Sequence, residues 1–172
     1  MIKLFRCRIC GDPYIGEKKP SRCPFCGAYE NFLVEIQEYK ETFDVELNEK
    51  DKKNVKKALE VEVSNAGFYF CAAERTSDET GRQLFKALGK VEAEHASIWK
   101  KILKLKEVKI GKSDRCTASL KDNLNESHSR EERAIEFYKQ ATKESENKRV
   151  REIFAALVLV EQDHLKFSEV KK

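Results

Sequence analysis

Four cysteines near the start of the chain have the spacing of metal ligands. The segment reads Cys7-Arg-Ile-Cys10-Gly11 and then Cys23-Pro-Phe-Cys26-Gly27, with twelve residues between Cys10 and Cys23. Each CxxC places two thiolates on a tight turn, and two facing turns form a tetrahedral cage for one iron or zinc ion. The trailing glycines can take positive φ, which lets backbone N–H groups approach the sulfurs. The spacing alone does not distinguish a redox-active iron ion from a structural zinc ion.

A second set of candidate ligands recurs at a fixed interval. A shift of 69 residues superposes Glu62 on Glu131, Tyr69 on Tyr138, Glu92 on Glu161 and His95 on His164. Agreement at one offset indicates two copies of a helical hairpin. In Glu-x-x-His, the carboxylate and the imidazole lie on one helix face, so both can reach the same ion. Two of the three histidines occur in this motif, so chance explains the pattern poorly.

Four long amphipathic helices are expected to position these residues. The apolar periodicity predicts helices over residues 49–75, from the 76–78 break to about 106, over about 119–144 and over about 147–170, with 104–115 as a connection. We expect the first helix to bury a stripe made of Leu59, Val63, Ala66, Phe70 and Ala73. Glu62 and Glu92 each lie fifteen residues from Ser77, about 22 Å along antiparallel helices. The second hairpin repeats this geometry, so all six ligands can converge.

Convergence would place four carboxylates and two imidazoles in one apolar core. Such burial is unfavourable unless cations offset it. Two divalent ions bridged by carboxylates meet that requirement, and mixed oxygen and imidazole ligands suit iron or manganese.

The composition fits a small module followed by a helical body. Four of six cysteines and all three prolines lie within the first 26 of 172 residues, whereas 37% of the chain is charged. We therefore predict a metal module over 1–40, which is too small to fold without a cross-link, and a bundle over 41–172. A net charge of +4 indicates no nucleic-acid or membrane partner. Because no apolar run has signal or membrane-spanning length, we expect a cytoplasmic protein, where CxxC pairs bind metals rather than form disulfides.

Several other residues admit two interpretations. Tyr69 and Tyr138 follow Glu62 and Glu131 by two helical turns and could hydrogen-bond the metal carboxylates, or simply fill the core. His128 lies one turn before Glu131 and could act near the metals, although an ordinary histidine is the simpler interpretation. We expect Cys71 and Cys116 to be packing residues. We expect Trp99 to lie in the core or at a dimer interface.

The motifs resemble those of a known family. CxxCG, Tyr14, Gly16, Pro20, CPxCG and Phe32 resemble the rubredoxin module of rubrerythrins, and the paired Glu and Glu-x-x-His motifs are similar to the ligand set of ferritin-like di-iron proteins. The resemblance implies a mainly α protein: a ferritin-like four-helix bundle preceded by a small N-terminal rubredoxin-like module, the reverse of the usual domain order.

The resemblance also implies a function. A rubrerythrin-like chain would be a non-haem di-iron peroxidase, with iron (alternatively zinc) in the four-cysteine site and two irons (alternatively manganese or a mixed iron and zinc pair) held by Glu62, Glu92, His95, Glu131, Glu161 and His164. Hydrogen peroxide or dioxygen would be the substrate, a redox protein such as a reductase the donor, and a homodimer would bring one subunit's module near the partner's dinuclear site. The alternatives are a ferroxidase or iron-handling protein, and a di-metal binding protein with a structural zinc knuckle. One departure is Ala134, where rubrerythrins carry an additional glutamate.

Overall fold

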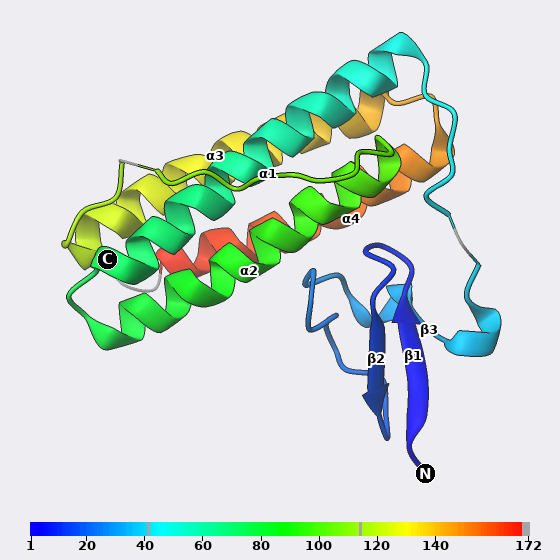
Figure 1. Cartoon of the computed structure of the whole chain (residues 1–172), viewed down its shortest axis with the longest axis horizontal. Helices are drawn as coiled ribbons and strands as arrows, with labels where there is room; N and C mark the ends of the chain where they lie inside the picture. Colours follow the sequence, from blue (N-terminus) through cyan, green and yellow to red (C-terminus); the bar gives the residue numbers. More distant parts are fainter. Residues whose placement is uncertain (41, 114, 170–172) are drawn as a thin grey trace.

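The protein consists of a four-helix bundle with a small sheet-containing module beside it (Figure 1). The computed structural model describes residues 1–40, 42–113 and 115–169. The helices of the bundle are α1 (Glu49–Arg75), α2 (Glu79–Ile102), α3 (Leu120–Glu144) and α4 (Lys148–Glu169). This architecture confirms the predicted fold class. None of the helices in the described part of the chain combines the length and the apolar character that a membrane crossing requires.

A side-chain cap marks the start of every helix. The capping acceptors are Asn48 for α1, Asp78 for α2, Ser119 for α3 and Asn147 for α4. The bounds of α1 are those predicted from the sequence, and α3 and α4 begin one residue later than expected. α2 ends at Ile102, four residues before the predicted Lys106, because Lys104 takes a φ of 55° that a helix cannot continue through. The predicted last residue of α4, Val170, lies outside the described residues.

The buried face of α1 differs from the predicted stripe. Of the five residues expected to form it, only Ala66 is buried, whereas Leu59, Val63, Phe70 and Ala73 are partly exposed. The buried positions of α1 include Val55, Ala58, Glu62, Asn65, Tyr69 and Ala72. Glu62 therefore faces the core of the bundle. The predicted stripe was based on apolar residues only, so it fell on the helix face next to the buried one.

The N-terminal module is a three-stranded antiparallel sheet with two cysteine turns. Its strands are β1 (Lys3–Cys7), β2 (Pro13–Gly16) and β3 (Leu33–Glu35), in the order β2-β1-β3, with short 3-10 helices over Glu30–Phe32 and Ile36–Glu38. Both trailing glycines adopt positive φ, 85° at Gly11 and 74° at Gly27, as the sequence predicted. The predicted division between residues 40 and 41 falls on Glu41, which lies outside the described residues, and stays a prediction.

The module packs against α2 and α4 and shares a core with the bundle. One cluster of buried side chains includes Ile9 and Leu33 from the module and Trp99, Phe154 and Leu157 from the helices. Polar contacts surround it: Arg8 pairs with Glu152 at 2.9 Å, Arg22 pairs with Asp163 at 2.6 Å, and Lys101 Nζ donates to the Cys10 carbonyl at 2.6 Å. A Cβ at Gly27 would lie 2.8 Å from Val160 Cγ1 of α4, so the second cysteine turn approaches the bundle as closely as backbone allows.

A disulfide joins α1 to the long connection between the two hairpins. Cys71 and Cys116 are bonded, with Cα atoms 5.9 Å apart, so the expectation that they are plain packing residues is wrong. The connection runs along the length of the bundle beside α1 (Figure 1). It passes close to the helix at Gly67, where an added Cβ would lie 2.6 Å from the Gly111 carbonyl oxygen. The disulfide holds the end of this segment in place before α3 begins.

We expect the disulfide to stabilise the fold. The two cysteines are 45 residues apart, and a cross-link closing a loop of that size removes unfolded-state entropy worth about 2–4 kcal/mol. The double variant Cys71→Ala/Cys116→Ala should lower the unfolding free energy by that amount in urea titrations at equal metal content. Mild reductant should destabilise the parent and leave the double variant unchanged. An equal midpoint for parent and double variant would contradict this expectation.

Candidate metal centres

The four module cysteines form a compact sulfur cage. Cys7 Sγ lies 3.8 Å from Cys26 Sγ, and Cys10 Sγ lies 3.8 Å from Cys23 Sγ, with all four residues buried. A tetrahedron with metal–sulfur bonds of about 2.3 Å has edges of about 3.8 Å, so the cage fits one tetrahedral ion. Backbone N–H groups of Ile9 and Asp12 donate to Cys7 Sγ and Cys10 Sγ, each at 3.4 Å.

Hydrogen bonds within the cage lower the pKa of two of the cysteine thiols and raise the pKa of the other two. Donation from Cys10 lowers the pKa of Cys7, and the interaction with Cys23 raises the pKa of Cys10. The pKa of Cys23 is lowered and that of Cys26 raised, both chiefly through Cys10. A metal ion binds the thiolate form of cysteine, so an ion in the cage would replace the protons that these sulfurs share.

The second cluster lies at mid-height in the bundle. The structure brings together all six residues that the repeat predicted, in two groups whose ligand atoms lie within 4.8 Å of one another: Glu62, Glu92, His95 and Glu161, and Glu92, Glu131, Glu161 and His164. His164 is 5% exposed, and the other five side chains are fully buried. Glu92 and Glu161 belong to both groups, so each is placed to bridge two ions.

Unpartnered polar atoms show that the second cluster suits cations. Oxygens of Glu62, Glu92, Glu131 and Glu161, together with His95 Nδ1, have no hydrogen-bond partner among the described residues. His95 Nδ1 lies 3.1 Å from Glu161 Oε1 without hydrogen-bonding geometry, as expected for two ligands that point at a common centre. Burying such atoms unpaired is unfavourable, and two bound cations would remove that cost.

The protonation of the cluster reflects the same crowding. Burial and the nearby Glu92 raise the pKa of Glu62 and of Glu131 well above the usual carboxyl range. Burial opposes charge on His95, but the carboxylates of Glu62 and Glu161 raise its pKa. Protons therefore neutralise part of the cluster, and cations that bind there would replace them.

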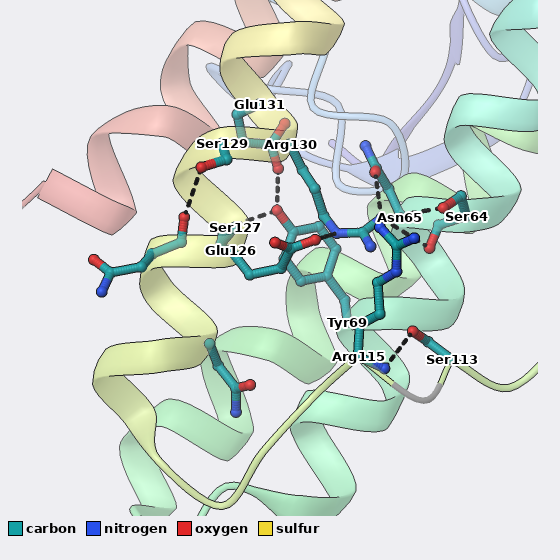
Figure 2. Close-up of polar contacts among 12 residues, drawn as sticks. Ser64, Asn65, Tyr69, Ser113, Arg115, Glu126, Ser127, Ser129, Arg130 and Glu131 are labelled. Carbon is teal, nitrogen blue, oxygen red and sulfur yellow. Dashed lines mark hydrogen bonds and ion pairs between the residues drawn. The ribbon is translucent and has the colours of Figure 1, made fainter.

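Two tyrosines support the carboxylates across the bundle. Tyr69 Oη donates to Glu131 Oε1, and Tyr138 Oη donates to Glu62 Oε1. Figure 2 shows the first of these contacts together with Ser127, whose Oγ lies 2.9 Å from Tyr69 Oη. Each tyrosine thus orients the glutamate of the other hairpin rather than the glutamate that precedes it in the sequence. The two repeats are tied together through these bonds.

A hydrogen bond connects the two clusters directly. His95 Nε2 lies 2.9 Å from the carbonyl oxygen of Cys26, while His95 Nδ1 faces the carboxylates. The imidazole is buried, so it can satisfy both contacts only as the tautomer with its hydrogen on Nε2 or as the imidazolium. The module that reaches His95 belongs to the same chain. The expected homodimer, with one subunit's module near the partner's dinuclear site, stays a prediction.

Other predicted residues lie apart from the cluster. His128 Nδ1 lies 2.9 Å from Ser168 Oγ, and Nε2 lies 3.4 Å from Glu132, so this side chain is not among the grouped ligand atoms. Trp99 is fully buried in the core. The roles of Ser127 and of the Cys26 carbonyl could not be predicted, because Ser127 belongs to no motif and the contacts of a backbone carbonyl leave no signal in the sequence.

Metal content tests the ligand assignment. Glu161 belongs to both groups, so Glu161→Ala should lose both ions of the bundle, whereas Glu62→Ala, which affects one group, should lose about one per chain. Mass-spectrometric metal analysis of the purified variants would measure this, with the exposed Glu169→Ala on the same helix as the control. Full metal content in Glu161→Ala would show that the cluster is not the metal site.

Comparison with known proteins agrees with this geometry. The family model for rubrerythrin matches residues 53–169. Reverse rubrerythrin-1 from Clostridium acetobutylicum is 33% identical over 114 residues, which cover 59% of this chain and 62% of that protein. The match thus spans less than two thirds of that relative, and no solved structure matches significantly. The family match extends over most of the chain and includes all six clustered Glu and His residues, so the chain belongs to the rubrerythrin family.

Proposed function

We propose that this protein is a non-haem di-iron peroxidase that reduces hydrogen peroxide to water with electrons passed through the four-cysteine site. Membership of the rubrerythrin family and similarity to a reverse rubrerythrin support an oxidoreductase with iron in both centres. The observation that carries the proposal is the 2.9 Å contact between His95 Nε2 and the Cys26 carbonyl oxygen. This one contact connects the sulfur cage to a ligand of the second cluster.

The contact offers a short route for electrons. Cys26 contributes Sγ to the cage and its carbonyl oxygen to the hydrogen bond, so only a few covalent bonds separate the sulfur from the imidazole of His95. The route is buried at both ends, because Cys26 and His95 are fully buried. A fixed, water-free path needs little rearrangement when charge moves along it.

The residues of the second cluster have separable roles in the proposed reaction. When bound, two iron ions would supply the two electrons that, with two protons, convert one hydrogen peroxide to two waters. Glu92 and Glu161 would bridge the ions, and Glu62, Glu131, His95 and His164 would each hold one. Tyr69 and Tyr138 hold two carboxylates in place by donating hydrogen bonds to them. Burial keeps bulk water from the site.

We propose iron at both sites, a separate redox protein as the electron donor, cytoplasmic location and a homodimer. Arginine and lysine side chains around the cysteine module, such as Arg22 and Lys101, are engaged in holding the module to the bundle. We propose that a donor contacts the module at Phe25, which is exposed in the second cysteine turn.

A single-turnover experiment tests the proposal. Fully reduced, iron-loaded protein mixed anaerobically with excess peroxide should turn red, as the iron of the sulfur cage is oxidised, at the rate at which peroxide disappears. The matched control is Glu161→Ala, which keeps the iron of the cage but should lack the dinuclear ions, so its cage iron should stay reduced on that time scale. Equally fast reddening of the variant would show direct attack on the cage iron and contradict the proposed route.

A further inference from the structure

Residues of α1 and α3 line a cavity. These two helices lie on the side of the bundle away from the cysteine module (Figure 1). We call the cavity the α1–α3 pocket. Its volume is about 380 Å³, and it is lined on α1 by Val61, Ser64 and Asn65 and on α3 by Arg130, Arg133 and Ala134. The volume lies within the range of small-molecule sites.

The floor of the α1–α3 pocket is close to the dinuclear cluster. Asn65 and Ala134 follow Glu62 and Glu131 by three residues, so each lies one turn from a candidate ligand on nearly the same helix face. The two floor positions are also equivalent in the repeat, 69 residues apart. Two residues that line the pocket thus lie one helical turn from candidate ligands of the cluster.

The lining of the α1–α3 pocket carries uncompensated positive charge. Four cationic side chains line it: Lys57, Arg115, Arg130 and Arg133. Lys57 pairs with Glu60 at 3.8 Å, and Arg130 pairs with Glu126 at 2.8 Å. In the described part of the chain, Arg115 and Arg133 have no ion pair, and both are exposed. Two guanidinium groups thus remain available to bind an anion.

A buried amide supplies a further donor. Asn65 is 3% exposed, and its Oδ1 accepts a hydrogen bond from Arg130 Nη1 at 3.3 Å. Its Nδ2 has no hydrogen-bond partner among the described residues. Figure 2 shows Asn65, Ser64, Arg130 and Arg115 gathered around the same space. Asn65 also lines the pocket, so this buried residue places an amide of unmet hydrogen-bonding capacity beside it.

Apolar side chains complete the lining. Val61, Ala134 and Phe137 provide an apolar wall beside the guanidinium groups. An inorganic ion would leave this wall uncovered, whereas a molecule with an acidic head and a short apolar body would contact both parts. The disulfide at Cys116 constrains the backbone one residue after Arg115, which lines the pocket.

We propose that the α1–α3 pocket binds a small organic anion. Arg115 and Arg133 hold its oxyanion head group, and Val61, Ala134 and Phe137 contact its apolar body. The head group can be a carboxylate or a phosphate ester, which share the chemistry recognised here. The site is independent of the proposed peroxidase activity, because binding requires no turnover.

Calorimetric titration of the metal-loaded full chain tests the site, with hexanoate and hexyl phosphate as probes and hexanol as the uncharged control. At least one anionic probe should bind saturably, and hexanol should not. Arg115→Gln/Arg133→Gln should weaken that binding at least about tenfold. Lys86→Gln/Lys90→Gln, which removes the same charge from exposed positions of α2, should leave it unchanged.

The control variant is essential because a carboxylate or phosphate could also ligate the metal ions. Such binding would be equally strong in the arginine and lysine variants, and that result would overturn the proposal. Absence of binding by both anionic probes would overturn it too, as would equal affinity for hexanol. Circular dichroism should show unchanged helix content in both double variants, which replace only exposed side chains. None of these outcomes depends on whether the protein reduces peroxide.

Discussion

The burial of four carboxylates and two imidazoles at one depth of the bundle is the constraint on which the rest of the structure depends. Unpaired charges in an apolar core are strongly unfavourable, and several oxygens of this cluster have no hydrogen-bond partner among the described residues. The two hairpins have turns at corresponding distances from their ligands, which brings the six groups to one level. Tyr69 and Tyr138 then cross between hairpins, so the arrangement of the ligands and the pairing of the hairpins are stabilised by the same bonds.

The position of the cysteine module follows from this centre. The module lies over α2 and α4, the helices that carry the two histidines (Figure 1). Arg22 and Asp163 form an ion pair next to His164, and the Cys26 carbonyl reaches His95. The opposite face, between α1 and α3, has no such cover in the described part of the chain and contains the pocket. The bundle thus has one side for the sulfur cage and another side open to small molecules.

Sequence patterns predicted what depends on local spacing. The 69-residue repeat identified all six clustered residues, because ligands at equal distances from two turns must meet. Apolar periodicity and the 76–78 break placed the helix starts within a residue or two, and the structure shows caps at Asn48, Asp78 and Ser119 there. Apolar periodicity gave the wrong face of α1, because some of the residues buried there carry polar groups. The predicted stripe excluded Glu62 and Tyr69, which are fully buried.

Features that depend on distant segments could not be predicted in the same way. Cys71 and Cys116 are 45 residues apart, and the expectation of a reducing compartment favoured free thiols, so the disulfide was missed. The α1–α3 pocket combines α1, α3 and the connection that carries Arg115, and its charge surplus appears only once the ion pairs of Lys57 and Arg130 are known. The division near residue 40 remains a prediction.

The contact between Cys26 and His95 within one chain has a consequence for assembly. If electrons pass from the sulfur cage to the dinuclear site inside a single polypeptide, association of subunits is not a step in that transfer. The transfer would then be first order in protein, with a rate constant unaffected by dilution below any subunit dissociation constant. A dimer, where it forms, would contribute to stability or to donor recognition. The electron-transfer path within each chain would be complete without it.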